Sequence, residues 1–287
     1  MSSIAASGDT APRVAEALAI RSGGSALGLR IGSALVLAPL AIAAAWVGSW
    51  PLTLLVTAAA LLMLGEWRRV MGGAILDGPG LLQGAALLGA MFIAGSGHAI
   101  VAAEVLLALT AAILVAAPRA ELPWWAAIGM SYIGLPCIAL IWLRRNPEGG
   151  LAVVLWLFAV VWATDIGAYA AGRLIGGPKL APAISPNKTW AGLAGGMLAA
   201  ALVGLLAVLL GGGTPALDLV LASVALSLVS QAGDLMESAF KRHFGAKDAG
   251  RLIPGHGGAL DRLDGMLFAA PAVVALVVFV EGVQPWR

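Results

Sequence analysis

The sequence predicts an all-α polytopic integral membrane protein. Of its 287 residues, 60% are hydrophobic and only 11% are charged, and the mean hydropathy is +0.94. Soluble domains are about half apolar and about a quarter charged, so this composition excludes an ordinary soluble fold. The apolar runs approach the roughly 20 residues that a spanning helix needs, and they lack the period-two alternation of a β-barrel. A helix is the expected element because it satisfies its own backbone groups in lipid.

About nine apolar runs, bounded by charged residues, glycine or proline, are predicted to span the membrane. They lie near 32–49, 51–65, 80–96, 98–117, 124–143, 151–171, 190–210, 216–233 and 265–282. The pattern allows the first two to be a tight pair broken at Trp50-Pro51. Residues 31–287 are therefore expected to form a single membrane-embedded domain. Residues 1–30 are expected to be a cytoplasmic tail, because they lack the apolar core and cleavage site of a removable signal peptide.

The positive charges indicate which way the chain crosses the membrane. With nine spans, all but three of the 17 Lys and Arg residues fall on the side that holds the tail. The exceptions are Arg144, Arg145 and Arg287. Cytoplasmic loops carry an excess of Lys and Arg, so this side is expected to face the cytoplasm. The expected location is the cell inner (cytoplasmic) membrane, with the polar segments 172–189 and 234–264 on the cytoplasmic side.

Acidic residues approach the membrane on this same side. Asp165 lies near the end of a long apolar run, where a carboxylate costs about 2.5–3.5 kcal/mol, so it points to function unless it sits at headgroup level. Asp234 abuts another apolar run. If that helix continues, Asp234, Glu237, Ser238 and Lys241 share one face. The alternative is an emerging helix with a solvated face and an internal Glu237–Lys241 ion pair.

Asp261 and Asp264 follow a glycine-rich stretch at the start of the last span. Two acids on one helical turn repel unless a cation lies between them, and hard oxygen ligands suit Mg²⁺. Acids also complement a helix N-terminus by about 0.3–1 kcal/mol each, but this does not explain four carboxylates at one depth. His256, between glycines, is placed to contact a phosphate or a base, although a lone loop histidine is more often only a polar surface group.

The segment 172–190 is irregular because it contains three prolines. Ser185-Pro186 resembles a helix N-cap followed by proline at the first helical position, which predicts Lys188 and Thr189 in the first turn. The free N–H groups of such a turn would form an anion or phosphate site. The alternative is an ordinary capped helix with a lysine placed by the positive-inside rule.

The polar segments together resemble a known signature. In order they are WATDIGAYAAGR, ISPNKTWAG, GDLMES, Ser238-x-Phe240-Lys241-Arg242-x4-Lys247-Asp248 and Pro254-x-His256-Gly257-Gly258-x-x-Asp261-Arg262-x-Asp264. This series resembles the phosphatidate cytidylyltransferases, also called CDP-diacylglycerol synthases. The resemblance is specific over 162–264 and only compositional before it. Ala259 departs from the pattern, where a larger aliphatic residue is expected, but no chemical group is lost.

The resemblance implies a nucleotidyltransferase of phospholipid biosynthesis, which converts CTP and phosphatidate to CDP-diacylglycerol and pyrophosphate. The lipid phosphate is already an anion near neutral pH, so the catalytic task is to gather negative charges and stabilise an in-line transition state. The expected cofactor is Mg²⁺, with a second cation left open. The expected partners are CTP, phosphatidate and the lipid bilayer, with no nucleic acid, and a homodimer is left open.

Residue roles follow from the resemblance and the pattern together. The expected metal ligands are Asp234, Asp261 and Asp264. The expected catalytic residues are Asp165, Lys188, Asp234, Lys241, Arg242 and Asp261. The expected substrate-binding residues are Ser185, Thr189, Ser238, Lys247, Asp248, His256 and Arg262.

Two other classes fit part of the pattern. A secondary transporter also has broken apolar segments and intramembrane acids, but its site lies near the midplane and its chain carries a repeat. Here the charges cluster on one side, and no two-fold repeat is evident. A related CTP-using enzyme, such as a prenol kinase or another CDP-lipid synthase, would share the site and differ in its lipid groove.

Overall fold

The structure is a computed structural model that describes residues 35–74, 76–116, 121–147, 149–211, 216–250 and 257–279. The predicted tail and His256 lie outside these residues. The helices are Leu35–Val47, α2 (Ser49–Val70), α3 (Gly78–Gly95), α4 (Ala99–Ala116), α5 (Glu121–Arg145), α6 (Gly150–Leu174), α7 (Trp190–Gly211), α8 (Ala216–His243) and α9 (Leu260–Phe279). Seven of them are long and apolar enough to cross a membrane, and the apolar helical stretches Leu35–Val47 and Ala99–Val115 are shorter. The predicted all-α polytopic class is confirmed.

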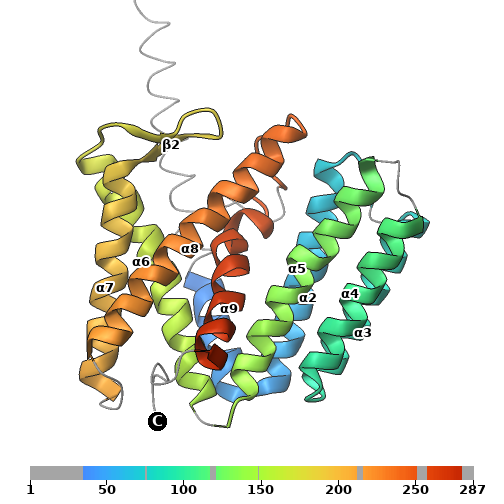
Figure 1. Cartoon of the computed structure of the whole chain (residues 1–287), viewed down its shortest axis with the longest axis horizontal. Helices are drawn as coiled ribbons and strands as arrows, with labels where there is room; N and C mark the ends of the chain where they lie inside the picture. The colour runs from blue at the N-terminus through green and yellow to red at the C-terminus, as the bar shows by residue number, and fades with distance from the viewer. Residues whose placement is uncertain are drawn as a thin grey trace, which may run out of the picture.

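The helices form two groups that meet in the middle of the molecule (Figure 1). On one side α6, α7 and α8 pack against one another, and on the other α2, α3, α4 and α5 do so. Helix α9 packs mainly on α8 and α5 and also touches α6 and α2, so it joins the two groups. The beginning of α9 carries predicted site residues, which therefore lie where the two halves of the protein meet.

Two helices extend further into the polar segments than predicted. Helix α8 continues to His243 instead of ending near 233, and α9 begins at Leu260 instead of 265. The eighth predicted span does continue as a helix. The residues predicted to share one of its faces therefore all lie on one continuous helix: Asp234, Glu237, Ser238 and Lys241. The helix persists here because its charged side chains find partners, as described below.

The break between the first two helices differs slightly from the prediction. It lies at Gly48, with φ 152° and ψ −175°, and not at Trp50-Pro51. This backbone region is accessible almost only to glycine. Pro51 falls in the first turn of α2, where proline is tolerated because the N–H groups there have no helical partner.

The segment before α7 forms a hairpin and not the start of a helix. Strand β1 (Lys179–Ala181) pairs antiparallel with β2 (Ser185–Thr189), so Lys188 lies on a strand. The helix starts at Trp190, and the Thr189 Oγ1 accepts a hydrogen bond from the Gly192 N–H at 3.0 Å. The predicted cap at Ser185 is therefore wrong. Thr189 is the capping residue because it directly precedes the uninterrupted apolar run.

Helices α6 and α7 approach closely through glycines. A Cβ at Gly192 would lie 2.9 Å from the Ala168 carbonyl oxygen, and one at Gly196 would lie 3.1 Å from the Thr164 carbonyl oxygen. Small residues of this kind let spanning helices pack backbone to backbone. The contact holds the hairpin that follows α6 next to the start of α7.

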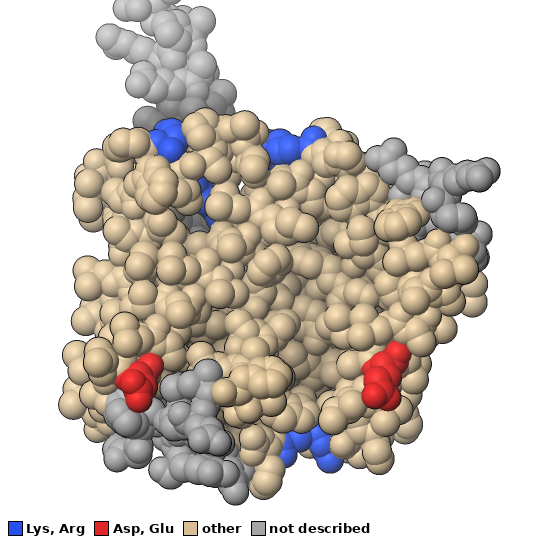
Figure 2. All heavy atoms as spheres, in the orientation of Figure 1, with Lys and Arg blue, Asp and Glu red and all other residues tan. Residues whose placement is uncertain are grey.

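Arg144 and Arg145 lie on the side that has few basic residues, and each binds the end of a helix. The Arg144 Nε donates to the Ala45 carbonyl at 2.5 Å, and the Arg145 Nη1 donates to the Gly95 carbonyl at 2.6 Å. Both acceptors lie near the carboxyl ends of helices, where carbonyls lack helical donors and the dipole favours a cation. Basic side chains occur at both ends of the molecule in Figure 2, and this pair lies at the end opposite the hairpin.

A second network fixes α2 to α3 through the connecting loop. The Asp77 carboxylate accepts hydrogen bonds from the Gly80 N–H at 2.7 Å and from the Arg68 Nη2 at 2.6 Å. These interactions, the Gly80 N–H first, lower the pKa of Asp77. The buried Arg68 also donates to the Gln83 Oε1 at 2.7 Å. Asp77 is thus an N-cap that serves only the scaffold.

Candidate active site

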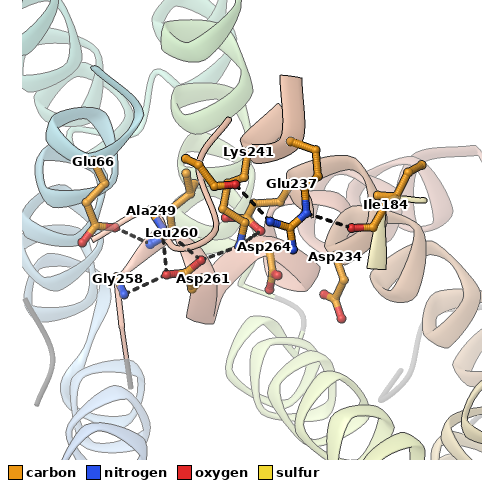
Figure 3. Close-up of polar contacts among 12 residues, drawn as sticks. Glu66, Ile184, Asp234, Glu237, Lys241, Ala249, Gly258, Leu260, Asp261 and Asp264 are labelled. Carbon is orange, nitrogen blue, oxygen red and sulfur yellow. Dashed lines mark hydrogen bonds and ion pairs between the residues drawn. The ribbon is translucent and has the colours of Figure 1, made fainter. Parts of the chain in front are cut away.

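The predicted acids come together where α6, α8 and α9 meet. Helices α8 and α9 approach very closely here. A Cβ added at Gly233 would lie only 2.6 Å from the Asp264 carbonyl oxygen. A Cβ at Gly265 would lie 3.2 Å from the Asp234 Oδ1. The Asp234 and Asp264 side chains point to the same side in Figure 3. Asp165, from α6, is close enough to both for their charges to interact.

The hairpin supplies a cation to this group. The Lys188 Nζ lies 2.9 Å from the Asp234 Oδ2, and both side chains are half-buried. Lys188 and Arg262 also interact electrostatically with Asp165. Strand β2 thus places the Lys188 ammonium beside two carboxylates, Asp234 of α8 and Asp165 of α6.

Lys241 organises the second part of the site. Its Nζ lies 2.6 Å from the Glu237 Oε2 and 2.6 Å from the Asp261 Oδ1, so one ammonium bridges α8 and α9. The internal Glu237–Lys241 pair considered from the sequence is confirmed. It is not a solvated pair, however, because the Glu237 side chain is 1% exposed and the Lys241 side chain 12%.

Asp261 is held by backbone donors as well as by Lys241. Its Oδ2 accepts from the Gly258 N–H at 2.9 Å and from the Ala249 N–H at 3.2 Å (Figure 3). Both oxygens therefore already have N–H partners. Asp261 closes the turn that leads into α9, as an acid at a helix N-terminus does.

One buried acid of this region, Glu66, was missed by the sequence reasoning. Glu66, on α2, accepts hydrogen bonds from the Ala259 and Leu260 N–H groups at the start of α9. Glu237 was noted on the face shared with Asp234, with a solvated face as the alternative, but its full burial was not predicted. The available signal for Glu66 was an ionisable residue directly after an apolar run, in LLMLGEWRR, but the predicted second span ended one residue before it.

The remaining predicted residues lie around this core. Thr189 is buried as a helix cap, Ser185 pairs with Ala181 in the hairpin, and Ser238 is half-buried on α8. Lys247 and Asp248 are exposed in the turn after α8.

Arg242 connects the end of α8 to the hairpin. It is exposed, and its Nε donates to the Ile184 carbonyl at 3.4 Å. A polyanion that enters the site would therefore meet Arg242 and Lys247, at the rim of the site, before it reaches Lys241.

The described residues do not form a preassembled metal cage. Among them, no group of three or more His, Cys, Asp or Glu side chains stands in metal-binding geometry. Asp234 uses one oxygen for Lys188, and Asp264 uses its Oδ1 for the Gly265 N–H at 2.8 Å. Each thus has a second oxygen with which to hold a hard cation. The arrangement is chemically suited to bind polyanions beside a cation.

Comparison with known proteins identifies the family. The sequence matches the model of the cytidylyltransferase family over residues 28–280. The chain belongs to the cytidylyltransferase family. It is 44% identical over 266 residues to a phosphatidate cytidylyltransferase of Brucella suis, which covers 86% of this chain and 91% of that protein. It is 45% identical over 152 residues to one of Staphylococcus saprophyticus, which covers 53% of this chain and 57% of that protein. The predicted family is confirmed.

Lys241, which pairs with both Glu237 and Asp261, gives a first prediction. Lys241→Met leaves Glu237 and Asp261 buried without their cation, which typically costs about 3–5 kcal/mol of stability. We expect a lower melting temperature in detergent and turnover reduced about 100-fold. Lys247→Met removes the same charge from an exposed turn and should leave the melting temperature unchanged.

A double variant separates charge from packing. Adding Glu237→Gln to Lys241→Met removes one of the two uncompensated acids, so part of the lost melting temperature should return. A double variant less stable than Lys241→Met alone would contradict the role of Lys241 as charge partner of Glu237.

Proposed function

We propose that this chain transfers the cytidylyl group of CTP to phosphatidate, producing CDP-diacylglycerol and pyrophosphate. The observation that carries the proposal is the cluster of acids and lysines at one end of a membrane-spanning bundle, in a member of the cytidylyltransferase family. The relatives named phosphatidate cytidylyltransferase supply the lipid substrate. Nothing in the geometry favours a transporter, because the charged side chains gather toward the ends of α8 and α9 and not at the midplane.

The chemistry asks little covalent work of the protein. An oxygen of the lipid phosphate attacks the α-phosphorus of CTP, and the bond from that phosphorus to the β-phosphate oxygen breaks, so pyrophosphate leaves with its electron pair. The attacking oxygen is an anion near neutral pH and needs no strong base. The task of the protein is to position polyanions and stabilise the charge that develops on the transferred group.

The lysines are already placed for this task. Lys188 and Lys241 each lie within 2.9 Å of a carboxylate, and an incoming phosphate offers the same kind of charged acceptor. Arg262 interacts with Asp165 in the same group. We assign these three residues, with Arg242 and Lys247 at the rim, to the phosphates of CTP, pyrophosphate and the lipid.

Magnesium fits this donor set in part. Asp234 and Asp264 would hold it, since each has an oxygen not used by its described hydrogen bond, and Asp165 would support it. Bound Mg²⁺ supplies neutralisation of phosphate charge. Asp261 remains a proposed ligand, but a cation there would have to replace one of its N–H donors.

The metal assignment gives a second prediction. Asp234→Asn and Asp264→Asn should each reduce CDP-diacylglycerol formation in detergent about 100-fold or more, because a neutral amide binds a hard cation poorly. The assay uses labelled CTP, phosphatidate and a Mg²⁺ titration. Asp218→Asn, the same change at the other end of α8, should retain wild-type turnover. Near-native, Mg²⁺-dependent activity in Asp234→Asn would refute the assignment.

The chain is a multi-pass membrane protein, and we propose that it lies in the cell inner membrane with its site facing the cytoplasm. Support comes from the basic residues of the hairpin and of the end of α8, which lie at the site end. Arg144 and Arg145, at the other end, are engaged with helix carbonyls.

Cysteine labelling tests this orientation in a Cys137→Ala background. Lys179 and Ser96 are both exposed, at opposite ends of the bundle. A membrane-impermeant maleimide should label Ser96→Cys in spheroplasts and Lys179→Cys only in inside-out vesicles. The reverse pattern would place the site on the outer face.

We also propose a homodimer, with α7 as the contact helix. Only 17% of its spanning window is buried within one chain, the lowest share among the seven long apolar helices, and Leu202 and Leu206 are exposed. Leu206→Cys in the Cys137→Ala background should form a disulfide-linked dimer in native membranes. Leu88→Cys, equally apolar on α3, should stay monomeric, and equal cross-linking at both positions would indicate random collision.

A further inference from the structure

Glu66 lies outside the segment that carries the family signature, yet it directly contacts the turn that leads into α9. It is 0% exposed near the carboxyl end of α2. Its Oε1 accepts from the Ala259 N–H at 3.0 Å, and its Oε2 accepts from the Leu260 N–H at 2.8 Å (Figure 3). Both carboxylate oxygens are therefore committed to the first amides of α9, directly before Asp261.

The backbone on both sides of this carboxylate leaves no spare room. A Cβ at Gly250 would lie 2.5 Å from the Glu66 Oε1, and a Cβ at Gly258 would lie 2.5 Å from its Oε2. Glu66 thus fits between two points of the connection from α8 to α9. Asp261 binds nearly the same two points, through the Ala249 and Gly258 N–H groups.

The next residue of α2 holds the other helix of the site. The Trp67 ring stacks on Phe240 with centroids 3.6 Å apart and planes 8° apart. The Trp67 Nε1 donates to the Trp125 carbonyl at 2.9 Å, which fixes the ring. Phe240 immediately precedes Lys241. Neighbouring residues of α2 therefore contact α9 beside Asp261 and α8 beside Lys241.

A buried carboxylate is an expensive way to hold a helix end if stability is the only purpose. Removing it from water costs several kcal/mol, which hydrogen bonds only partly offset. Helix α9 also has its own acid, Asp261, in its first turn. What Glu66 adds is a fixed direction, because two acceptors on a rigid helix determine where the first turn of α9 points.

We propose that Glu66 is a positioning residue for the cytidylyl transfer. By holding the first amides of α9, it aims Asp261 at Lys241 and Asp264 at Asp234, and it couples the α2–α5 half of the protein to the catalytic half. The proposal rests on the proposed function, since the reaction it serves is the one assigned to this site.

Glu66→Gln is the primary test, because it keeps the size of the side chain but turns an NH₂ group toward one of the two N–H donors. We expect kcat to fall about 10–100-fold, as for partners that orient a metal site, while the KM for CTP changes little. More Mg²⁺ should be needed for half-maximal rate. Amide exchange at 257–264 should become faster.

Asp77→Asn is the matched control. Asp77 also accepts from the first-turn amide of a helix, α3, and its described hydrogen bonds, to Gly80 and Arg68, reach neither α8 nor α9. It should lower the melting temperature and leave kcat, Mg²⁺ dependence and exchange at 257–264 unchanged.

The outcomes separate the possibilities. If Glu66→Gln lowers only the melting temperature, with wild-type kcat and exchange at 257–264, Glu66 is a structural cap and the proposal is overturned. If Glu66→Gln does not fold, Gly250→Ala decides, since its new methyl group displaces the Glu66 carboxylate while keeping the charge. Wild-type kcat in Gly250→Ala overturns the proposal, and a loss of kcat supports it. A wild-type protein without CDP-diacylglycerol formation refutes the proposed function, and the exchange data then still show whether Glu66 holds the turn.

Discussion

The buried and half-buried carboxylates of this site lie inside a membrane-spanning bundle, where an N–H donor or an ammonium stabilises them. Asp234 has Lys188, Asp261 has Lys241 and two amides, and Glu66 has the first amides of α9. Much of the architecture follows from these requirements. The hairpin must fold back over the helix ends to deliver Lys188, and α8 must continue past its apolar run to deliver Lys241. Helix α9 must begin beside α2, where its free amides meet a carboxylate.

The same pairs suggest how the site accommodates its substrates. In this structure Lys188 and Lys241 pair with Asp234, Glu237 and Asp261, while Asp264 and Asp165 add further negative charge. CTP and phosphatidate bring further negative charge, and a hard cation brings positive charge. Binding is then an exchange of partners among charges that are already close, which requires little movement of the backbone. Such an arrangement keeps the reorganisation during the reaction small, as electrostatic catalysis requires.

The spans, their one-sided basic charge and the grouping of Asp165, Asp234, Asp261 and Asp264 could be predicted because they depend on local composition and helical spacing. The hairpin could not, because three prolines indicate irregular backbone without saying which residues pair across it. Thr189 was placed inside a helix that it actually caps, since Ser185-Pro186 offered an equally good local signal. Glu66 was missed because its contact with Leu260 spans 194 positions along the chain, and no local pattern reports such a contact. The full burial of Glu237 is likewise a tertiary property, which depends on where α9 packs.

The approach of α8 and α9 at Gly233 and Gly265 has a consequence for how such an enzyme can vary. The separation of Asp234 and Asp264 is set by the absence of side chains at two positions that offer no functional group to a substrate. A single methyl group at either position would push the helix axes apart and with them the two carboxylates. The spacing of these acids can therefore change through residues that never touch a ligand. Variation at the crossing would alter which cation fits, or how tightly, while every charged residue stayed the same.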